Sequence, residues 1–390
     1  MLIRYHNARV IRENKTEDLC VLTKDGTIVE ICARSDAPAD ETVDCGGNYL
    51  APGFADLHVH GGGGFSAMGN TPAEILGMCR AHLKHGVTSI LPTALAAPVE
   101  RLQRAVDVIS AAKEQSKDCN ILGVHLEGPF LSPKKAGAQK PENLLLPTEE
   151  NILGLLDYSK EIRLIGAAPE LPGGMRLGEE AAKRGIVASV AHSDADFSVA
   201  EEALFHGYSD ITHIFSASSA MHKEGVFRQV GVAEAGLALD GYTAQFIGDL
   251  RHLPRGAIKL ILKAKDADKA YLITDGLEFA GCGLPNGTEV MQENGQAAVI
   301  EDGVMKLADR SCLAGSIATM DGMVKNLVEI CGVSLPDAVR CASTTPLRVI
   351  GYGDRKGKIQ PGYDADMILF DDQIRIHRVI VSGKTVNFRT

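Results

Sequence analysis

Short apolar runs alternate along this chain of 390 residues with amphipathic stretches that have the spacing of helices. Eight such runs can be counted, and they are FADLHVH, VTSILPTAL, ILGVHLE, IRLIGAAPE, IVASVAH, DITHIF, YTAQFIG and KAYLITD. Between many of them lie helix-like segments, for example PVERLQRAVDVISAAKEQ and FSVAEEALFHG. Strand followed by helix, repeated eight times, predicts an α/β protein with a TIM (β/α)8 barrel, although a doubly wound open sheet would show the same alternation.

The two ends of the chain differ from its middle. The segment LCVLTKDGTIVEICA carries strand signals around a hairpin turn at Asp25 and Gly26, and GKIQPGYDADMILFDDQIRIHRVIVSGKTVNF carries similar signals near the C-terminus. We predict that both termini together form one small β-sandwich domain, made of residues 1–50 and 356–390. The catalytic barrel would then occupy residues 51–355.

Composition narrows the class of partner. The formal net charge of −10 gives no support for binding of nucleic acid or of an anionic membrane. The first residues, MLIRYHNARVIRENKTE, lack the apolar core of a signal peptide, and no apolar run is long enough to cross a bilayer. The nine cysteines form no C-x-x-C pair, which argues against a disulfide framework or a zinc ribbon. We expect a cytoplasmic protein whose partner is a small molecule.

Polar residues end several of the eight apolar runs. His58 and His60 share one face of the first run, because side chains alternate across a strand. The other residues are Glu127, His192, His213 and Asp275, which end the third, fifth, sixth and eighth runs. Since a barrel brings the carboxyl ends of its strands to one face, we expect these side chains to meet there. Imidazole and carboxylate ligands suit zinc or iron(II), so the set predicts a hydrolytic metal site.

Other interpretations of single residues remain open. Any one histidine could be a buried core residue, and Asp275 could be only a metal ligand or the N-cap of a helix beginning at GLEFAG. The run from Gly61 to Gly64 lacks the spaced glycines and the Lys-Ser/Thr pair of nucleotide loops, so we expect a flexible active-site turn and no nucleotide cofactor. His82, His85 and His206 lie in helix-like stretches with Lys and Glu, where exposed positions are expected.

Several motifs together resemble a known family. The segments are APGFADLHVHG, HLEGPFLSPKKAGA, AHSDAD, THIF, LITDG and the terminal GKIQPGYDADMILFD. They resemble the amidohydrolase superfamily and, within it, the N-acetylglucosamine-6-phosphate deacetylases, over most of the chain. The most specific piece is HLEGPF with the lysine pair and AGA that follow it. No lysine ends the fourth strand, so the carbamylated-lysine bridge of many relatives is not expected.

The resemblance implies an activity and a role for each of these residues. It implies hydrolysis of N-acetylglucosamine 6-phosphate to glucosamine 6-phosphate and acetate, through attack of a metal-bound hydroxide. Asp275 matches the general acid/base of the family, and His252 matches a histidine that contacts substrate. The implied metal ligands are Glu127, His192 and His213 for a principal ion, with His58 and His60 for a second, so each chain would hold one or two zinc or iron(II) ions. A homodimer with the pocket near the subunit boundary is also implied.

The departures from the family concern the substrate pocket. Gln139 stands where the deacetylases usually have a histidine, and it can donate a hydrogen bond but cannot carry a proton. The family's FNAM is replaced by FSAS, and the resemblance implies that Ser216 and Ala217 of this segment contact the substrate. The family has an arginine linked to phosphate recognition, and Arg228 is its best match in this sequence, with Lys223 as the weaker match. A deacetylase acting on another N-acyl amino sugar or small N-acyl compound is the nearest alternative, and a non-catalytic binding relative is a more distant one.

Overall fold

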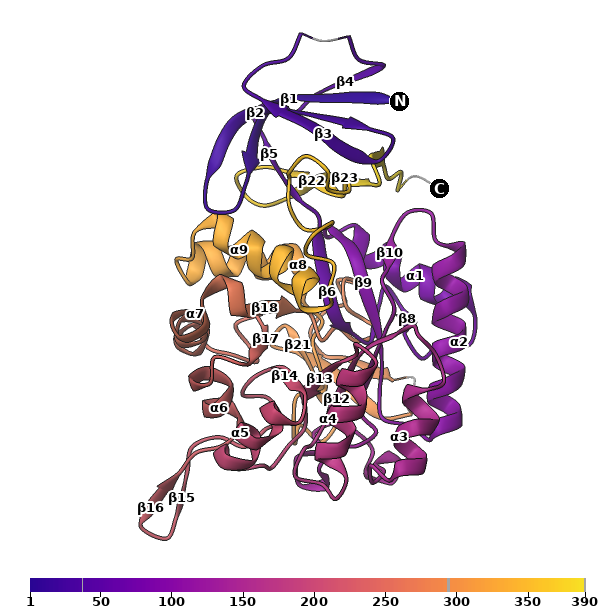
Figure 1. Ribbon diagram of the computed structural model, residues 1–390, viewed down its shortest axis with the longest axis vertical. Helices are drawn as coiled ribbons and strands as arrows, with labels where there is room; N and C mark the ends of the chain where they lie inside the picture. Colours follow the sequence, from indigo (N-terminus) through magenta and orange to yellow (C-terminus); the bar gives the residue numbers. More distant parts are fainter. Residues whose placement is uncertain (37, 293–294, 389–390) are drawn as a thin grey trace.

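The computed structural model describes residues 1–36, 38–292 and 295–388, and Figure 1 shows a barrel beneath a separate small sheet. The barrel strands pair in parallel with their neighbours in chain order. They are β6 (Phe54–Val59), β9 (Val87–Ala94), β11 (Val124–Glu127), β12 (Ile162–Ala167), β13 (Val187–Val190), β14 (Tyr208–Ile211), β17 (Thr243–Ile247) and β18 (Ala270–Ile273), with the short β10 (Asn120–Ile121) beside β9. All eight strands expected from the sequence are present.

The sheet closes between its first and last strands. Val59 forms a parallel bridge with Gly276, and the backbone N–H of Asp275 donates to the carbonyl of His58 at 2.9 Å. An open doubly wound sheet would leave these two strands apart. The predicted TIM barrel is therefore confirmed, and its closure brings the end of the first strand against the end of the eighth.

Helices surround the barrel and follow its strands (Figure 1). They are α1 (Pro72–Leu83), α2 (Val99–Gln115), α3 (Glu149–Leu156), α4 (Gly174–Lys183), α5 (Phe197–Phe205), α6 (Val232–Ala238), α7 (Arg255–Lys269), α8 (Met320–Lys325), α9 (Leu335–Ala342) and α10 (Thr344–Val349). Short 3₁₀ turns, η1 (Pro133–Lys135) and η2 (Pro141–Asn143), follow β11, and a π-helical turn, η3 (Asn326–Ile330), follows α8. No helix in the described part of the chain is long and apolar enough to cross a membrane.

Local sequence explains where these helices begin and which face they bury. Thr71 and Glu74 form a reciprocal capping box at the start of α1, which satisfies backbone N–H groups that the helix itself leaves free. Along α2 the buried residues recur every three or four positions, as Leu102, Ala105, Val106, Ile109 and Ala112. That spacing gives one apolar face, and this face packs on the barrel strands.

The second part of the molecule is a sheet made from both termini. Its strands are β1 (Leu2–Ile11), β2 (Thr16–Lys24), β3 (Thr27–Cys32), β4 (Glu41–Asp44), β5 (Tyr49–Pro52), β22 (Met367–Phe370), β23 (Ile376–Val381) and β24 (Lys384–Thr385). Antiparallel pairing of β5 with β22 joins the N-terminal strands to the C-terminal ones. The expected turn connects β2 to β3, with positive φ of 49° at Asp25 and 87° at Gly26. The β domain built from both termini is confirmed. Its exact residue boundaries stay a prediction, and the first of them, between residues 50 and 51, lies inside β5.

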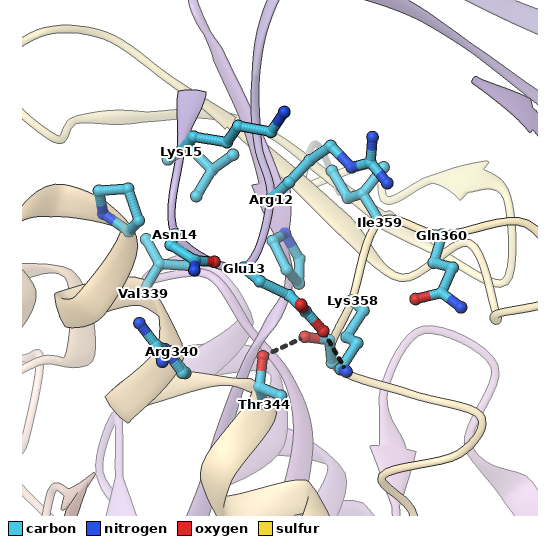
Figure 2. A pocket seen from close by; sticks show the side chains of 14 residues that line it. Arg12, Glu13, Asn14, Lys15, Val339, Arg340, Thr344, Lys358, Ile359 and Gln360 are labelled. Atoms are coloured by element: carbon cyan, nitrogen blue, oxygen red, sulfur yellow. Dashed lines mark hydrogen bonds and ion pairs between the residues drawn. The ribbon is translucent and has the colours of Figure 1, made fainter. Parts of the chain in front are cut away.

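A cavity of about 500 Å³ lies where the terminal sheet meets α9 and α10 (Figure 2). Its basic side chains have acidic partners within the chain. Lys358 Nζ lies 2.5 Å from Glu13 Oε1, and Lys15 Nζ lies 2.9 Å from Glu17 Oε1. Arg12 and Arg340 also pair with acidic side chains, so ion pairs within the chain engage the basic groups of this cavity between the two parts of the molecule.

In the described part of the chain, three small antiparallel units lie outside the two main sheets. The first pairs β7 (Gly61–Gly62) with β8 (Phe65–Ser66), directly after the first barrel strand. The second, β15 (His222–Glu224) with β16 (Phe227–Gln229), is a hairpin that projects away from the barrel at the lower left of Figure 1. The third is made of β19 (Thr288–Met291), β20 (Ala297–Glu301) and β21 (Val304–Leu307), and the segments that flank it contribute to the site described below.

Candidate metal centre and substrate cavity

Six side chains converge at the carboxyl-terminal face of the barrel. His58 lies in β6 and Glu127 ends β11, whereas the other four lie one or two residues beyond their strands, and these are His60, His192, His213 and Asp275. All six are largely or wholly buried, and the most exposed side chain, that of Asp275, is 13% accessible. The sequence predicted that these six residues would meet, and the structure brings all of them together.

Glu127 stands at the centre of this cluster. Its Oε1 lies 2.9 Å from His213 Nε2 and 3.2 Å from the Nε2 atoms of His192 and His58. Its Oε2 lies 3.3 Å from His60 Nε2. One carboxylate therefore contacts four imidazoles, which is the position of a ligand shared between two sites.

Two groups of three side chains have ligand atoms close enough to share an ion. One is His58, Glu127 and His213, and the other is His58, His60 and Asp275, with the ligand atoms of each group within 4.8 Å of one another. Asp275 Oδ1 lies 3.2 Å from His60 Nε2 and 3.6 Å from His58 Nε2. Donor sets of histidine and carboxylate with these spacings fit zinc or iron(II).

The outer nitrogens of the four histidines show which way each ring faces. Every Nδ1 has an acceptor outside the cluster: Gln245 Oε1 for His58, Thr93 O for His60, Lys135 O for His192 and Ser216 O for His213, at 2.7–3.1 Å. Since these partners accept, the Nδ1 atoms donate, and the Nε2 atoms point to the interior of the cluster. Metal-binding histidines are typically oriented in this manner, so the residues fit the ion that the donor set suggests.

The cluster keeps its carboxylates ionised. Burial would raise the pKa of Glu127, but the charges of His58 and His192 outweigh it and hold that pKa well below its usual range. For Asp275 the hydrogen bond from His60 and the charge of His58 overcome burial and lower the pKa to about 2. Burial would lower the pKa of His60, yet contacts with Asp275 and Glu127 raise it to about 10. Protons on the imidazoles thus balance the negative charge of the two carboxylates, and a divalent cation bound by the deprotonated Nε2 atoms would provide that positive charge in their place.

Three of these residues have an unusual backbone conformation. The φ angles of His192, His213 and Asp275 are 44°, 26° and 48°, in the left-handed region that residues other than glycine rarely adopt. Such angles cost about 1–3 kcal/mol and concentrate at functional sites. Here they occur where each chain segment turns away from its strand. The alternative that Asp275 caps a helix is excluded, because the next regular element after it is the strand β19.

A buried polar layer beneath the cluster was not predicted from the sequence. Gln245 accepts from His58 through Oε1 and donates from Nε2 to Asp210 Oδ2 at 2.7 Å. Thr243 and Tyr271 also donate their hydroxyls to Asp210, at 2.6 and 3.0 Å. Burial raises the pKa of Asp210 to about 6. The signal in the sequence is a charged residue and an amide inside the apolar runs DITHIF and YTAQFIG.

The glycine run and His82 differ from the sequence-based expectation. A Cβ on Gly61 would lie 2.5 Å from the carbonyl oxygen of Phe65, and one on Gly62 would lie 2.6 Å from His82 Nε2. Gly61 and Gly62 are therefore close-packed, whereas Gly63 and Gly64, with φ of 63° and 90°, form the exposed turn that joins β7 to β8. His82 was expected to be exposed, but it is buried and its Nε2 contacts the carbonyl of Gly61 at 2.8 Å. It belongs to the buried face of α1, whereas His85 and His206 are partly exposed.

The cluster lies in a cavity of about 420 Å³ that includes most of the predicted substrate residues. Ser216, Ala217 and His252 line it, and His252 Nδ1 lies 2.7 Å from Asp249 Oδ2. Gln139 also lines it, but both of its polar atoms are used within the chain. Its Nε2 donates to Glu127 Oε2 at 2.7 Å, and its Oε1 accepts from the N–H of Ala96 at 3.1 Å.

Arg228 is the one predicted substrate residue that does not line this cavity. It lies on β16, in the hairpin that projects from the barrel, and it is exposed there. Two large apolar neighbours, Val226 and Phe227, are 85% and 71% exposed. A contact between Arg228 and a substrate in the cavity of the same chain is therefore not present in this structure.

Comparison with known proteins gives a consistent result. The family model described as "Amidohydrolase family" matches residues 49–386. N-acetylglucosamine-6-phosphate deacetylase of Lysinibacillus sphaericus is 31% identical over 95% of this chain and 94% of its own length, and that of Homo sapiens is 32% identical over 99% and 95%. Among solved structures, the deacetylase of Pasteurella multocida covers 99% of this chain and 100% of its own with a TM-score of 0.91 at 28% identity. A mutant of the Mycobacterium smegmatis enzyme in complex with N-acetyl-D-glucosamine-6-phosphate gives 0.88 at 26% identity, covering 99% and 98%.

Proposed function

This chain belongs to the amidohydrolase family, and we propose that it is a metal-dependent deacetylase that converts N-acetylglucosamine 6-phosphate and water to glucosamine 6-phosphate and acetate. The observation that carries the proposal is the contact of Glu127 with four inward-facing imidazoles beside Asp275, in a cavity of substrate size. The relatives that match this chain over nearly their full length bear the name of this activity.

We assign the metal ligands as follows. Glu127, His192 and His213 would hold a principal divalent ion, and His58 and His60, with Glu127 shared, would hold a second. Zinc and iron(II) both suit this set, with one or two ions per chain. A cation held there supplies Lewis acidity, which lowers the pKa of water and polarises a carbonyl oxygen.

Asp275 is proposed to move the proton. Its pKa of about 2 keeps it ionised at neutral pH, so it can accept a proton from the attacking water. The water oxygen bonds to the amide carbon, and the C–N bond then breaks. Asp275 returns the proton to the amine nitrogen, because an unprotonated amine is a poor leaving group. The acetyl group leaves as acetic acid, which becomes acetate by losing its proton to the amine or to solvent, and the Asp275 carboxylate is regenerated.

The substrate residues are proposed from their positions in the cavity. His252, which is hydrogen-bonded to Asp249, would contact the sugar. Ser216 and Ala217, which line the same cavity, would also contact it. Gln139 is proposed to position Glu127 and to affect the substrate only through that carboxylate, because its amide already donates a hydrogen bond to it.

We further propose that the protein is a homodimer in which the hairpin β15–β16 packs on the second copy. Val226 and Phe227 give the hairpin exposed apolar side chains that association would cover. Because Arg228 lies on the same hairpin, its predicted substrate contact requires a second copy. Sedimentation of wild type beside Phe227→Asp tests the dimer, which the substitution should weaken.

The activity is tested by measuring acetate release from N-acetylglucosamine 6-phosphate after reconstitution with zinc or iron(II). N-acetylglucosamine serves as the unphosphorylated comparison, and Asp275→Asn serves as the inactive control. Metal-dependent release with a strong preference for the phosphate ester is expected. Hydrolysis of neither compound by metal-loaded protein would contradict the proposed substrate and leave only the family assignment.

A further inference from the structure

His58 differs from the other three histidines of the cluster in the group that its outer nitrogen faces. The Nδ1 atoms of those three face backbone carbonyls, which can only accept a hydrogen bond. These carbonyls belong to Thr93, Lys135 and Ser216. The Nδ1 atom of His58 instead faces the side-chain amide of Gln245, whose Oε1 lies at 3.0 Å. An amide can present either an acceptor or a donor, so the tautomer of His58 depends on how Gln245 is oriented.

The tautomer of His58 decides whether this side chain can hold a cation. Its Nε2 points into the cluster, where it lies 3.2 Å from Glu127 Oε1 and 3.6 Å from Asp275 Oδ1. A histidine ligand is neutral, so a proton on Nδ1 leaves the lone pair of Nε2 for the ion. If the amide of Gln245 were turned over, its N–H₂ group would donate to Nδ1, and the proton of the ring would lie on Nε2 instead. The orientation of one amide therefore determines whether His58 is a ligand.

Asp210 binds the other end of this amide. Its Oδ2 accepts from Gln245 Nε2 at 2.7 Å, and the same carboxylate accepts from the hydroxyls of Tyr271 and Thr243 at 3.0 and 2.6 Å. Burial raises the pKa of Asp210 to about 6, which still leaves the group ionised at pH 7.5. An ionised carboxylate has no donor. It therefore accepts only the N–H₂ end of the amide, which turns Oε1 of Gln245 toward His58.

The surroundings of Gln245 oppose the turned orientation. Asp210, Gln245, Tyr271 and His58 are completely buried, and they come from the strands β14, β17, β18 and β6. A turned amide would bring its carbonyl oxygen to about the same place as Nε2, against an oxygen of the Asp210 carboxylate. Two acceptors in contact away from solvent lose their hydrogen bonds, and a buried polar group without a partner is costly.

We propose that Asp210 is a positioning residue for the metal centre, which acts through the amide of Gln245 to keep the proton of His58 on Nδ1 and so sets the affinity for the ion that His58 holds. The inference rests on the proposed function for the ligand role of His58. It goes beyond the support that one hydrogen bond gives to a ligand, because it states that the direction of the amide controls metal binding.

The test measures metal affinity for each bound ion by competition with a chelator, and His58→Ala identifies the ion that depends on His58. Asp210→Leu keeps a similar volume but removes the acceptor, so Gln245 can present either end to His58. We expect the affinity for the His58-dependent ion to fall about 10- to 100-fold, the range typical for partners of metal ligands. Addition of Gln245→Glu to Asp210→Leu should restore most of this loss, because a carboxylate can only accept from His58.

Tyr271→Phe is the matched control. It removes a buried hydroxyl that is bonded to the same oxygen of Asp210, and it leaves the bond from Gln245 in place. It should lower the thermal unfolding midpoint and leave the metal affinity unchanged. If Asp210→Leu does not fold, the double variant Asp210→Asn/Gln245→Glu serves instead. Its amide donates to the new carboxylate, which accepts from His58, so the wild-type metal affinity is expected.

Four results would overturn the inference. They are unchanged metal affinity in His58→Ala or in Asp210→Leu, failure of the variants with Gln245→Glu to bind the His58-dependent ion, and an equal loss of affinity in Tyr271→Phe. Because metal binding is measured without substrate, a protein that binds metal but hydrolyses neither sugar would contradict the proposed function and still decide the role of Asp210.

Discussion

The inner end of the cavity, at the cluster of six side chains, and its outer end, at the opening, are formed by different kinds of structural element. At the inner end six side chains come from the ends of barrel strands, are buried, and have fixed hydrogen-bond partners. At the outer end the lining comes from η1, from the segment after β14 and from residues beside the β19–β21 sheet, and Lys134 is largely exposed. The barrel strands thus position the side chains of the proposed metal centre, whereas the loops line the part of the cavity that would select the substrate. The two properties should therefore respond to different substitutions.

Replacement of Glu127 should have the largest effect, because it removes the charge shared by four imidazoles. Glu127→Gln keeps the shape of the side chain but places an N–H₂ donor where a ligand is needed. We expect bound metal to fall towards zero equivalents and activity to fall below detection. Metal analysis with acetate release tests this, and an unchanged thermal unfolding midpoint is the control for folding. A variant with full metal content would show that Glu127 is not a ligand.

Asp275→Asn should separate proton transfer from metal binding within the inner end. The amide cannot accept the proton of water, and the loss of positioned acid/base help lowers kcat by about 10²- to 10⁴-fold. The ions assigned to the histidines and Glu127 should remain. Near-normal turnover would make the acid/base assignment wrong, whereas a parallel loss of metal would make Asp275 a ligand.

The layer beneath the cluster should matter to a smaller degree. Gln245→Leu removes the acceptor of His58 Nδ1 and leaves Asp210 without one of its donors. Partners of metal ligands typically contribute 10- to 100-fold to metal affinity. We expect weakening within that range, measured by competition with a chelator, and no change in the ratio of the two sugar substrates. A changed ratio with unchanged metal affinity would contradict the division between the two ends.

Gln139 lies between the two ends and should give the smallest effect. Because its amide bonds to Glu127 and Ala96, Gln139→Ala should weaken metal binding by about tenfold, which corresponds to about 1.5 kcal/mol, the lower end for a hydrogen bond to a charged group. The preference for the phosphate ester should persist. If the preference falls while metal affinity does not, Gln139 belongs to the outer end.

The sequence predicted the inner end far better than the outer one. Eight apolar runs, several of them ended by a polar residue, were sufficient to place His58, Glu127 and Asp275 at one face, because a closed barrel brings the carboxyl ends of its strands together. The burial of His82 follows from its place on the same helical face as Ile75 and Cys79, a periodicity that its charge-rich neighbours obscured.

Other features depend on contacts that no local pattern contains. The hydrogen bond from Gln245 to Asp210 joins two strands of the barrel, and His192 has a left-handed backbone conformation with φ of 44°. Arg228 was assigned by similarity of motif, but its position depends on where the hairpin projects. Such features require the assembled barrel before they can be recognised.

The most direct test of this account is a metal titration of chelator-stripped protein, with bound equivalents and acetate release from N-acetylglucosamine 6-phosphate followed together. The account predicts no turnover in the stripped protein and a rise of activity with bound zinc or iron(II) that saturates at one or two equivalents per chain. Full activity in the stripped protein, or one to two bound equivalents without any hydrolysis, would contradict it.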